Sequence, residues 1–183
     1  MSRAASPFLA ILLVLGFVPA VFAQADGGAL LIPGDNGAVA VSCAIAGSDL
    51  DFSVTFPSPI RSYLGPTQPA MSLTFFLDTD KNPRTGFAKS EDARKGGDYS
   101  LDLTVRLVND TVQANADDVT LAQHSSESTF GRLVPVKATF RVDGNKIEVL
   151  LPLSAMKLKK GKPVRIAAQT GSGAYVDQSI ELK

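Results

Sequence analysis

The sequence of 183 residues contains no tryptophan, one cysteine, one histidine and only three tyrosines. A single cysteine excludes an intrachain disulfide, and one histidine beside one cysteine leaves too few nitrogen and sulfur ligands for an ordinary zinc site. Eighteen basic and eighteen acidic residues cancel, so no basic field points to nucleic acid as a partner. Beyond an apolar run near the N-terminus, no segment is long and apolar enough to predict a membrane helix.

The N-terminal segment has the pattern of a signal peptide. Arg3 gives a positive start, residues 8–18 are apolar, and Val21 and Ala23 stand at the positions that a signal peptidase reads. An uncleaved anchor is the alternative, although the apolar run is short for a bilayer. We expect an exported protein, periplasmic or extracellular, with no stable membrane span after cleavage. The expected parts are a signal peptide at 1–23, a flexible linker at 24–37 and one domain at 38–183.

Apolar and polar residues alternate along most of the chain, and no long segment has helical periodicity. Leu50, Phe52 and Val54, for example, alternate with Asp51 and Ser53, which is typical of strands with one buried face. The pattern predicts an all-β fold, a two-sheet antiparallel β-sandwich of jelly-roll or immunoglobulin-like type. A further short strand is expected inside the linker, at 29–32. About nine strands are expected in the domain: 38–45, 50–56, 71–77, 99–107, 111–116, 134–142, 147–153, 164–168 and 176–182.

Turn residues separate these strands. Asn109 and Asp110 both tolerate positive φ and predict a tight turn. Gly144 lies between 134–142 and 147–153, which form the clearest hairpin of the sequence. Cys43 falls on an apolar row and is expected to be buried.

A polar loop after the strand 71–77 holds closely spaced oxygen ligands. Asp78, Asp80 and Asn82 occupy alternate positions, the carbonyl of Arg84 follows, and Asp98 re-enters from the next strand. Calcium takes six to eight oxygen ligands, so this loop predicts a calcium site. A hydrogen-bonded turn rich in Asp and Asn is the alternative. Magnesium suits the loop less well because it keeps more water, and the loop does not match an EF-hand.

The sequences FFLDTDKNPRTG (75–86) and GGDYSLDL (96–103) resemble a block found in family-9 carbohydrate-binding modules and the related DOMON-like sandwiches. Residues 149–154 and 161–168 also look similar to later parts of those domains. The resemblance implies a β-sandwich with a structural calcium ion, held by Asp78, Asp80, Asn82 and Asp98.

The ligand is less clear from this resemblance. Sugar-binding members are expected to hold the sugar between aromatic rings, chiefly tryptophan, which this chain lacks. Tyr63 and Tyr175 are the ligand-binding candidates that remain, and a partly buried packing role is the alternative for each. Haem-binding relatives need axial ligands, for which His124 with Met71 or Met156 is the conceivable pair.

The expected function is that of a non-catalytic binding or accessory domain, whose partner is a glycan or another surface protein. A structural or assembly component of the cell envelope is the alternative. A hydrolase is less favoured, because the carboxylate pairs at 91–92 and 117–118 are adjacent and one histidine leaves little room for a catalytic triad. The lysine-rich segment 157–162 is either a solvated face or a docking patch.

Overall fold

The structure, a computed structural model, describes residues 30–33, 37–87, 91–128, 130–158, 161–169 and 175–182. The expected signal peptide at 1–23 lies outside the described residues, as does much of the expected linker at 24–37. Within the described part of the chain, no helix is long and apolar enough to cross a membrane.

The described chain forms two antiparallel sheets, which confirms the predicted all-β sandwich. The first sheet has the order β1-β2-β3-β10-β9, and the second has the order β12-β11-β4-β5-β7-β8, with β6 paired to β5. The strands of the first sheet are β1 Leu30–Ile32, β2 Val39–Ala46, β3 Asp49–Thr55, β9 Thr139–Asp143 and β10 Lys146–Pro152. Those of the second are β4 Ala70–Asp78, β5 Tyr99–Val108, β6 Thr111–Gln113, β7 Val119–Gln123, β8 Arg132–Val134, β11 Pro163–Gln169 and β12 Tyr175–Glu181.

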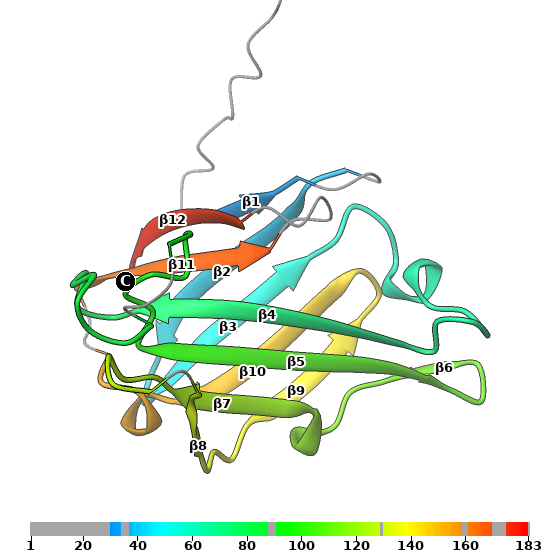
Figure 1. Cartoon of the computed structure of the whole chain (residues 1–183). Coiled ribbons are helices and arrows are strands. Elements are labelled where there is room, and N and C mark those ends of the chain that lie inside the picture. Colours follow the sequence, from blue (N-terminus) through cyan, green and yellow to red (C-terminus); the bar gives the residue numbers. More distant parts are fainter. Residues whose placement is uncertain are drawn as a thin grey trace, which may run out of the picture.

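The two sheets lie face to face, and their strands cross at an oblique angle (Figure 1). At one edge β1 contacts β11 and β12, so the sheets approach each other there. The β4–β5 loop, whose sequence predicts a metal site, lies at one end of the sandwich (Figure 1).

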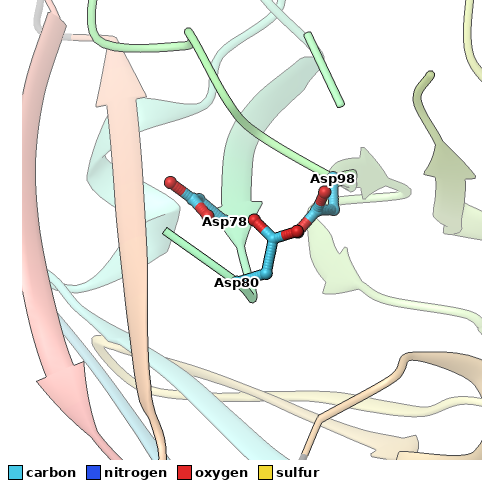
Figure 2. A group of neighbouring side chains, drawn as sticks. All are labelled: Asp78, Asp80 and Asp98. Atoms are coloured by element: carbon cyan, nitrogen blue, oxygen red, sulfur yellow. The ribbon is translucent and has the colours of Figure 1, made fainter. Parts of the chain in front are cut away.

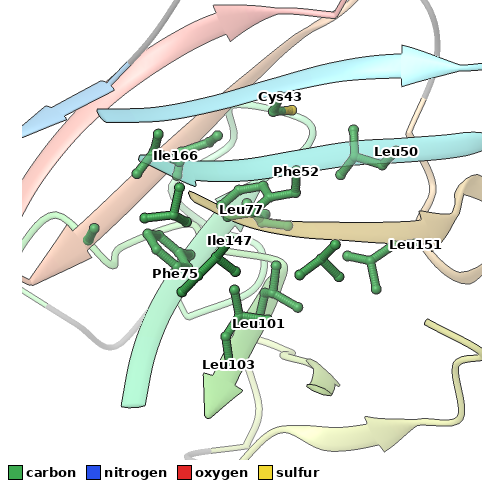
Figure 3. Close-up of a cluster of buried hydrophobic side chains, with 14 of the residues drawn as sticks. Cys43, Leu50, Phe52, Phe75, Leu77, Leu101, Leu103, Ile147, Leu151 and Ile166 are labelled. Atoms are coloured by element: carbon green, nitrogen blue, oxygen red, sulfur yellow. The ribbon is translucent and has the colours of Figure 1, made fainter. Parts of the chain in front are cut away.

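The core lies between the sheets and consists of the apolar rows that the alternation predicts. Phe52 of β3 and Phe75 of β4 meet across the layers with ring centroids 4.9 Å apart (Figure 3). Leu101 and Leu103 of β5 are also fully buried, and Cys43 is 6% exposed, as predicted. Burial of apolar surface at about 25 cal/mol per Å² is the main stabilising contribution in such a fold.

Two differences from the predicted strands concern single segments. Residues 134–142 do not form one strand: β8 ends at Val134 in one sheet and β9 begins at Thr139 in the other. Pro135 follows β8 directly and has no N–H for a ladder bond, which favours a break at this position. The strand β7 was not predicted, although Val119 and Leu121 are its buried alternate residues. The short strand expected inside the linker, at 29–32, is present as β1 and pairs with β2.

The predicted turns are confirmed. Asn109 and Asp110 have φ angles of 49° and 61° and join β5 to β6. Gly144, with a φ of 56°, lies in the β9–β10 hairpin. Three short 3₁₀ turns complete the described structure: η1 Ile60–Tyr63, η2 Ala116–Asp118 and η3 Leu153–Ala155.

Candidate metal centre

The pairing of β4 with β5 brings the two ends of the polar loop together. Asp78 is the last residue of β4 and Asp98 directly precedes β5, since Leu77 is paired with Tyr99. The Asp98 N–H donates to the Leu77 carbonyl at 2.8 Å. The sheet register therefore holds two carboxylates that are 20 positions apart side by side.

The loop between them depends on residues with positive φ. Lys81 has a φ of 57° and Gly86 a φ of 52°. A Cβ atom at Gly86 would lie 2.2 Å from the Gly97 carbonyl oxygen, so only glycine fits this close approach of two backbones. The Phe87 N–H donates to that same carbonyl at 2.9 Å, which closes the loop.

Asp78, Asp80 and Asp98 form a cluster in which one ligand atom from each lies within 4.8 Å of the others. Figure 2 shows the Asp80 carboxylate between the other two. Asp78 is 4% exposed, Asp98 is half-buried and Asp80 is exposed. Two like charges 4.8 Å apart repel each other by about 1 kcal/mol in water and about 3.5 kcal/mol at a protein surface. The cluster is therefore a place where a cation or a proton would be stabilising.

Hydrogen bonds within the loop orient each carboxylate. Asp98 Oδ2 accepts from the Thr79 N–H at 2.8 Å and from the Thr79 hydroxyl at 2.6 Å. Asp78 Oδ1 accepts from the Lys81 N–H at 2.6 Å. Asp80 Oδ1 accepts from the Asn82 N–H at 2.8 Å and from the Thr85 hydroxyl at 3.0 Å. Each carboxylate is thus held in place while the three remain close together.

Arg165 provides a positive charge behind the cluster. It is the register partner of Asp78 on the neighbouring strand β11, and its Nε lies 3.2 Å from Asp78 Oδ2. Its Nη1 also pairs with Asp177 at 2.9 Å, and its two terminal nitrogens donate to the carbonyls of Ala93 and Lys95. One guanidinium therefore joins the loop to β11 and β12, and it offsets only part of the charge of three carboxylates.

Burial raises the pKa of Asp78 above its usual value of 3.8, because desolvation disfavours its charged form. The negative charge of Asp98 acts in the same direction. The hydrogen bonds from Lys81 and Arg165 and the charge of Arg165 oppose this shift. A proton at Asp78 therefore competes with a metal ion for this carboxylate.

The donor set fits a hard cation. Three carboxylates offer oxygen ligands and no sulfur, which suits ions such as calcium, magnesium or manganese more than softer metals. The Asp78, Asp80 and Asp98 cluster could therefore hold a metal ion. The predicted convergence of these three side chains is confirmed.

The other two predicted ligands lie in the same loop. Asn82 is exposed, and its side-chain Oδ1 accepts from the Arg84 N–H at 3.1 Å. The Asn82 carbonyl accepts from the Thr85 N–H at 3.1 Å and from the Thr85 hydroxyl at 2.8 Å. These bonds form the turn that gives Asp80 its position between the other two carboxylates.

The two predicted ligand-binding tyrosines lie away from this loop. Tyr63 is in η1, which precedes the first residue of β4, whereas Asp78 is the last. Its ring packs against Phe56 at 5.2 Å, and its buried hydroxyl has no hydrogen-bond partner among the described residues. Tyr175 begins β12, opposite Gln169 of β11.

His124 follows β7 beside the loop. Its Nε2 lies 3.0 Å from the hydroxyl of Ser100, and Phe76 and Phe87 pack against its ring. Its Nδ1 is buried and has no partner within the described chain, so no carboxylate orients the ring as in a catalytic triad. Burial lowers the pKa of His124, which favours the neutral imidazole.

The two methionines considered as haem ligands with His124 lie elsewhere. Met156 is buried in the core, at 2% exposure. Met71 is opposite Val105, six residues along β5 from Tyr99 and therefore roughly 20 Å from it.

A cleft of about 920 Å³ opens beside the cluster. Asp80 and Asp98 lie on its wall, whereas Asp78 does not. The β7–β8 loop and the η3–β11 connection provide the other walls. The remaining lining residues are Thr79, Lys81, Thr85, Gly86, Tyr99, Gln123, His124, Ser125, Ser126, Lys157, Leu158, Lys162 and Pro163.

Sequence reasoning missed Arg165 as a partner of the cluster. It lies 87 positions from Asp78, between the apolar residues Val164 and Ile166 of a strand. The available signal was a charged residue, Arg165, between two apolar residues of a strand. The alternation of apolar and polar residues does not identify which acidic residue it pairs with.

Comparisons with known proteins add no relative: no protein-family model and no curated protein matches the chain. The function is therefore inferred from the residues of the site.

Proposed function

We propose that the chain is an exported, non-catalytic binding or accessory domain in which calcium, bound by the β4–β5 loop, has a structural role. The single observation that supports this most is the cluster of three carboxylates within 4.8 Å, oriented by hydrogen bonds from Thr79, Lys81 and Thr85. Oxygen-only ligands on a loop suit calcium better than magnesium, because calcium tolerates irregular geometry. Asn82 and the Arg84 carbonyl are proposed as further ligands of the same ion. Export rests on the signal-peptide pattern of residues 1–23.

The structural role follows from what the loop connects. Asp78 ends β4 and Asp98 precedes β5, so an ion between them links two central strands of the second sheet. Without a cation, the mutual repulsion of the carboxylates opposes the loop conformation. With one cysteine the chain has no intrachain disulfide, so a metal ion would be its cross-link between these two strands. The proposed partner is a glycan or a surface protein, a proposal that rests on the signal-peptide pattern, the sandwich and the Asp-rich loop.

Thermal unfolding of the purified protein, in calcium and after removal of all metal, tests this proposal. An ion that binds only the folded state adds about 2.7 kcal/mol at a hundredfold excess over its dissociation constant. We expect a higher melting temperature in calcium for the native chain and no such increase for Asp80→Asn, which keeps the size of the side chain but removes its charge. Asp117→Asn, at an exposed position in η2, is the matched control and should respond like the native chain.

Elemental analysis first confirms that the native chain has been freed of metal. If adding calcium to this protein then leaves its melting temperature unchanged, the loop is a hydrogen-bonded turn and not a calcium site.

A second candidate function, a component of an envelope assembly, is favoured by one surface. The short strand β8 is an edge of the second sheet, with Leu133 69% exposed and the preceding Phe130 84% exposed. An edge with exposed apolar side chains can pair with another chain. Light scattering at high concentration tests self-association, and a lower mass for Leu133→Lys than for the native chain would support it.

A further inference from the structure

The cleft beside the candidate metal centre has the chemistry of an anion-binding site. Its lining contains three lysines, Lys81, Lys157 and Lys162, against two carboxylates, Asp80 and Asp98. None of these lysine side chains forms an ion pair with another described residue. The cleft thus already has an excess of positive charge, and a divalent ion held by Asp80 and Asp98 would increase it.

The backbone on both sides of the lysine-rich segment is anchored. The Lys157 N–H donates to the hydroxyl of Tyr99, itself 3% exposed, at 3.3 Å. The Lys162 carbonyl accepts from the Leu182 N–H at 3.3 Å, and Gly161 donates to the Leu182 carbonyl at 2.9 Å. Lys157 and Lys162 both line the cleft that also holds Asp80 and Asp98. Because their backbone is fixed by these hydrogen bonds, the segment is better suited to be a docking patch than a solvated face.

The rest of the lining offers neutral hydrogen-bonding groups. Hydroxyl groups come from Ser125 and Ser126, and an amide comes from Gln123. The hydroxyls of Thr79 and Thr85 donate to Asp98 and Asp80, so they offer a ligand only an acceptor oxygen. Such groups suit a ligand that has its own hydroxyls in addition to a negative charge. A volume of about 920 Å³ lies within the usual range for small-ligand sites, about 300–1,000 Å³.

We propose that this cleft binds an acidic saccharide, a ligand with a carboxylate next to several hydroxyl groups, between the bound calcium ion and Lys157 and Lys162. The inference rests on the proposed calcium site, because Asp80 and Asp98 belong to both the cluster and the cleft wall. Asp78 pairs with Arg165 and does not line the cleft, so a ligand in the cleft would reach an ion held by the cluster from the side of Asp80 and Asp98. Recognition by charge and hydroxyl groups also needs no tryptophan, which the chain lacks.

Calorimetric titration of the full chain with a galacturonic acid trimer tests this inference. We expect binding in calcium, and affinity at least about tenfold weaker after metal removal or in the double variant Lys157→Gln with Lys162→Gln. Lys137→Gln, an exposed lysine outside the cleft lining, is the matched control and should bind like the native chain. A neutral glucose trimer and inorganic phosphate are the comparison probes, and both should bind at least about tenfold more weakly.

The calcium-dependent rise in melting temperature, measured on the same samples, separates the two proposals. If that rise is present in native and double-variant protein but the acidic trimer does not bind, the inference is wrong and the calcium site stands. Equal binding of the neutral trimer, equal binding of phosphate, or unchanged affinity in the double variant would also overturn it. If the rise is absent from the native chain, the calcium site itself is wrong.

Discussion

Asp78, Asp80 and Asp98 converge on one point but differ in their surroundings. Asp78 is buried beside Arg165, Asp98 is fixed by both donors of Thr79, and Asp80 is exposed. The spacing of these residues in the sequence was sufficient to predict that they converge. Their burial was not predictable, because it depends on contacts that are distant in sequence. Asp78 lies beside Arg165 of β11 and against Gly96 of the β4–β5 loop.

The raised pKa of Asp78 predicts how the proposed stabilisation by calcium depends on pH. In the metal-free protein, the folded state holds the Asp78 proton more tightly than the unfolded state does. The stabilisation that results from this proton is fully present below the pKa of Asp78 in the unfolded state. It is lost as the pH rises through the higher pKa of Asp78 in the folded state. Calcium at the proposed site would bind the deprotonated carboxylate, so the stabilisation expected from calcium changes in the opposite direction.

The difference in melting temperature between calcium-loaded and metal-free protein should therefore widen from about pH 4 to about pH 7. Parallel thermal scans across this range measure it. A constant difference at every pH would show that no proton competes with the ion.

Cys43 lies in the core and is expected to be unreactive. Burial, with a smaller contribution from the charge of Asp51, raises the pKa of its thiol to about 12. At pH 8 only about one thiol in ten thousand would then be ionised, and the thiolate is the reactive form. We expect no labelling of native protein by a disulfide reagent and complete labelling in denaturant, measured by absorbance. Rapid labelling without denaturant would mean that the first sheet opens locally.

At the scale of elements, the β4–β5 loop depends on Gly86. Its φ of 52° disfavours a side chain, and the 2.2 Å approach of a Cβ atom to the Gly97 carbonyl oxygen excludes one. Gly144 has a similar φ of 56° but no atom within 4 Å of its Cβ position. Alanine at Gly144 would therefore report only the free-energy cost of the backbone conformation, whereas alanine at Gly86 would add the cost of the clash with Gly97.

Gly144→Ala should cost about 1–2 kcal/mol of unfolding free energy, because a left-handed backbone disfavours Cβ. Gly86→Ala should cost a further amount of about 1–3 kcal/mol, because the clash is with backbone atoms, and it should also weaken calcium binding. Denaturant unfolding and calcium titration of both variants test this. Equal losses of stability in the two variants would contradict the close approach of Gly86 to Gly97.

The elements themselves were predictable to different degrees. The turns at Asn109 and Gly144 follow from local φ preferences, and both are confirmed. The continuous strand expected at 134–142 was wrong, because its alternation passes through Pro135 while the chain changes sheets. The strand β7 was missed, although Val119 and Leu121 are its buried alternate residues.

At the scale of the whole molecule, stability comes mainly from the interface between the sheets. Phe52 is fully buried and packs on Phe75, so Phe52→Ala should lower the free energy of unfolding by about 3–5 kcal/mol. Phe130→Ala, at a residue that is 84% exposed, should leave it nearly unchanged. Denaturant unfolding of both variants measures the contrast. A small loss for Phe52→Ala would mean that the core can collapse around the cavity.

The sequence by itself determined the features that depend on neighbouring residues. Alternation with a period of two identified the apolar face of most strands, and residues that tolerate positive φ predicted the turns. The spacing of Asp78 and Asp80, with Asp98 at the start of the next strand, predicted their convergence, because these strands are paired across one loop.

Only the tertiary structure decided which strands are neighbours and which sheet each one joins. An alternating strand has the same pattern in either sheet, so nothing local places Arg165 beside Asp78 or separates β8 from β9. The cleft exists because loops from three parts of the chain meet at one end of the sandwich. Lys157 and Lys162 are distant in sequence from Asp80 and Asp98, and their proximity is a consequence of strand order.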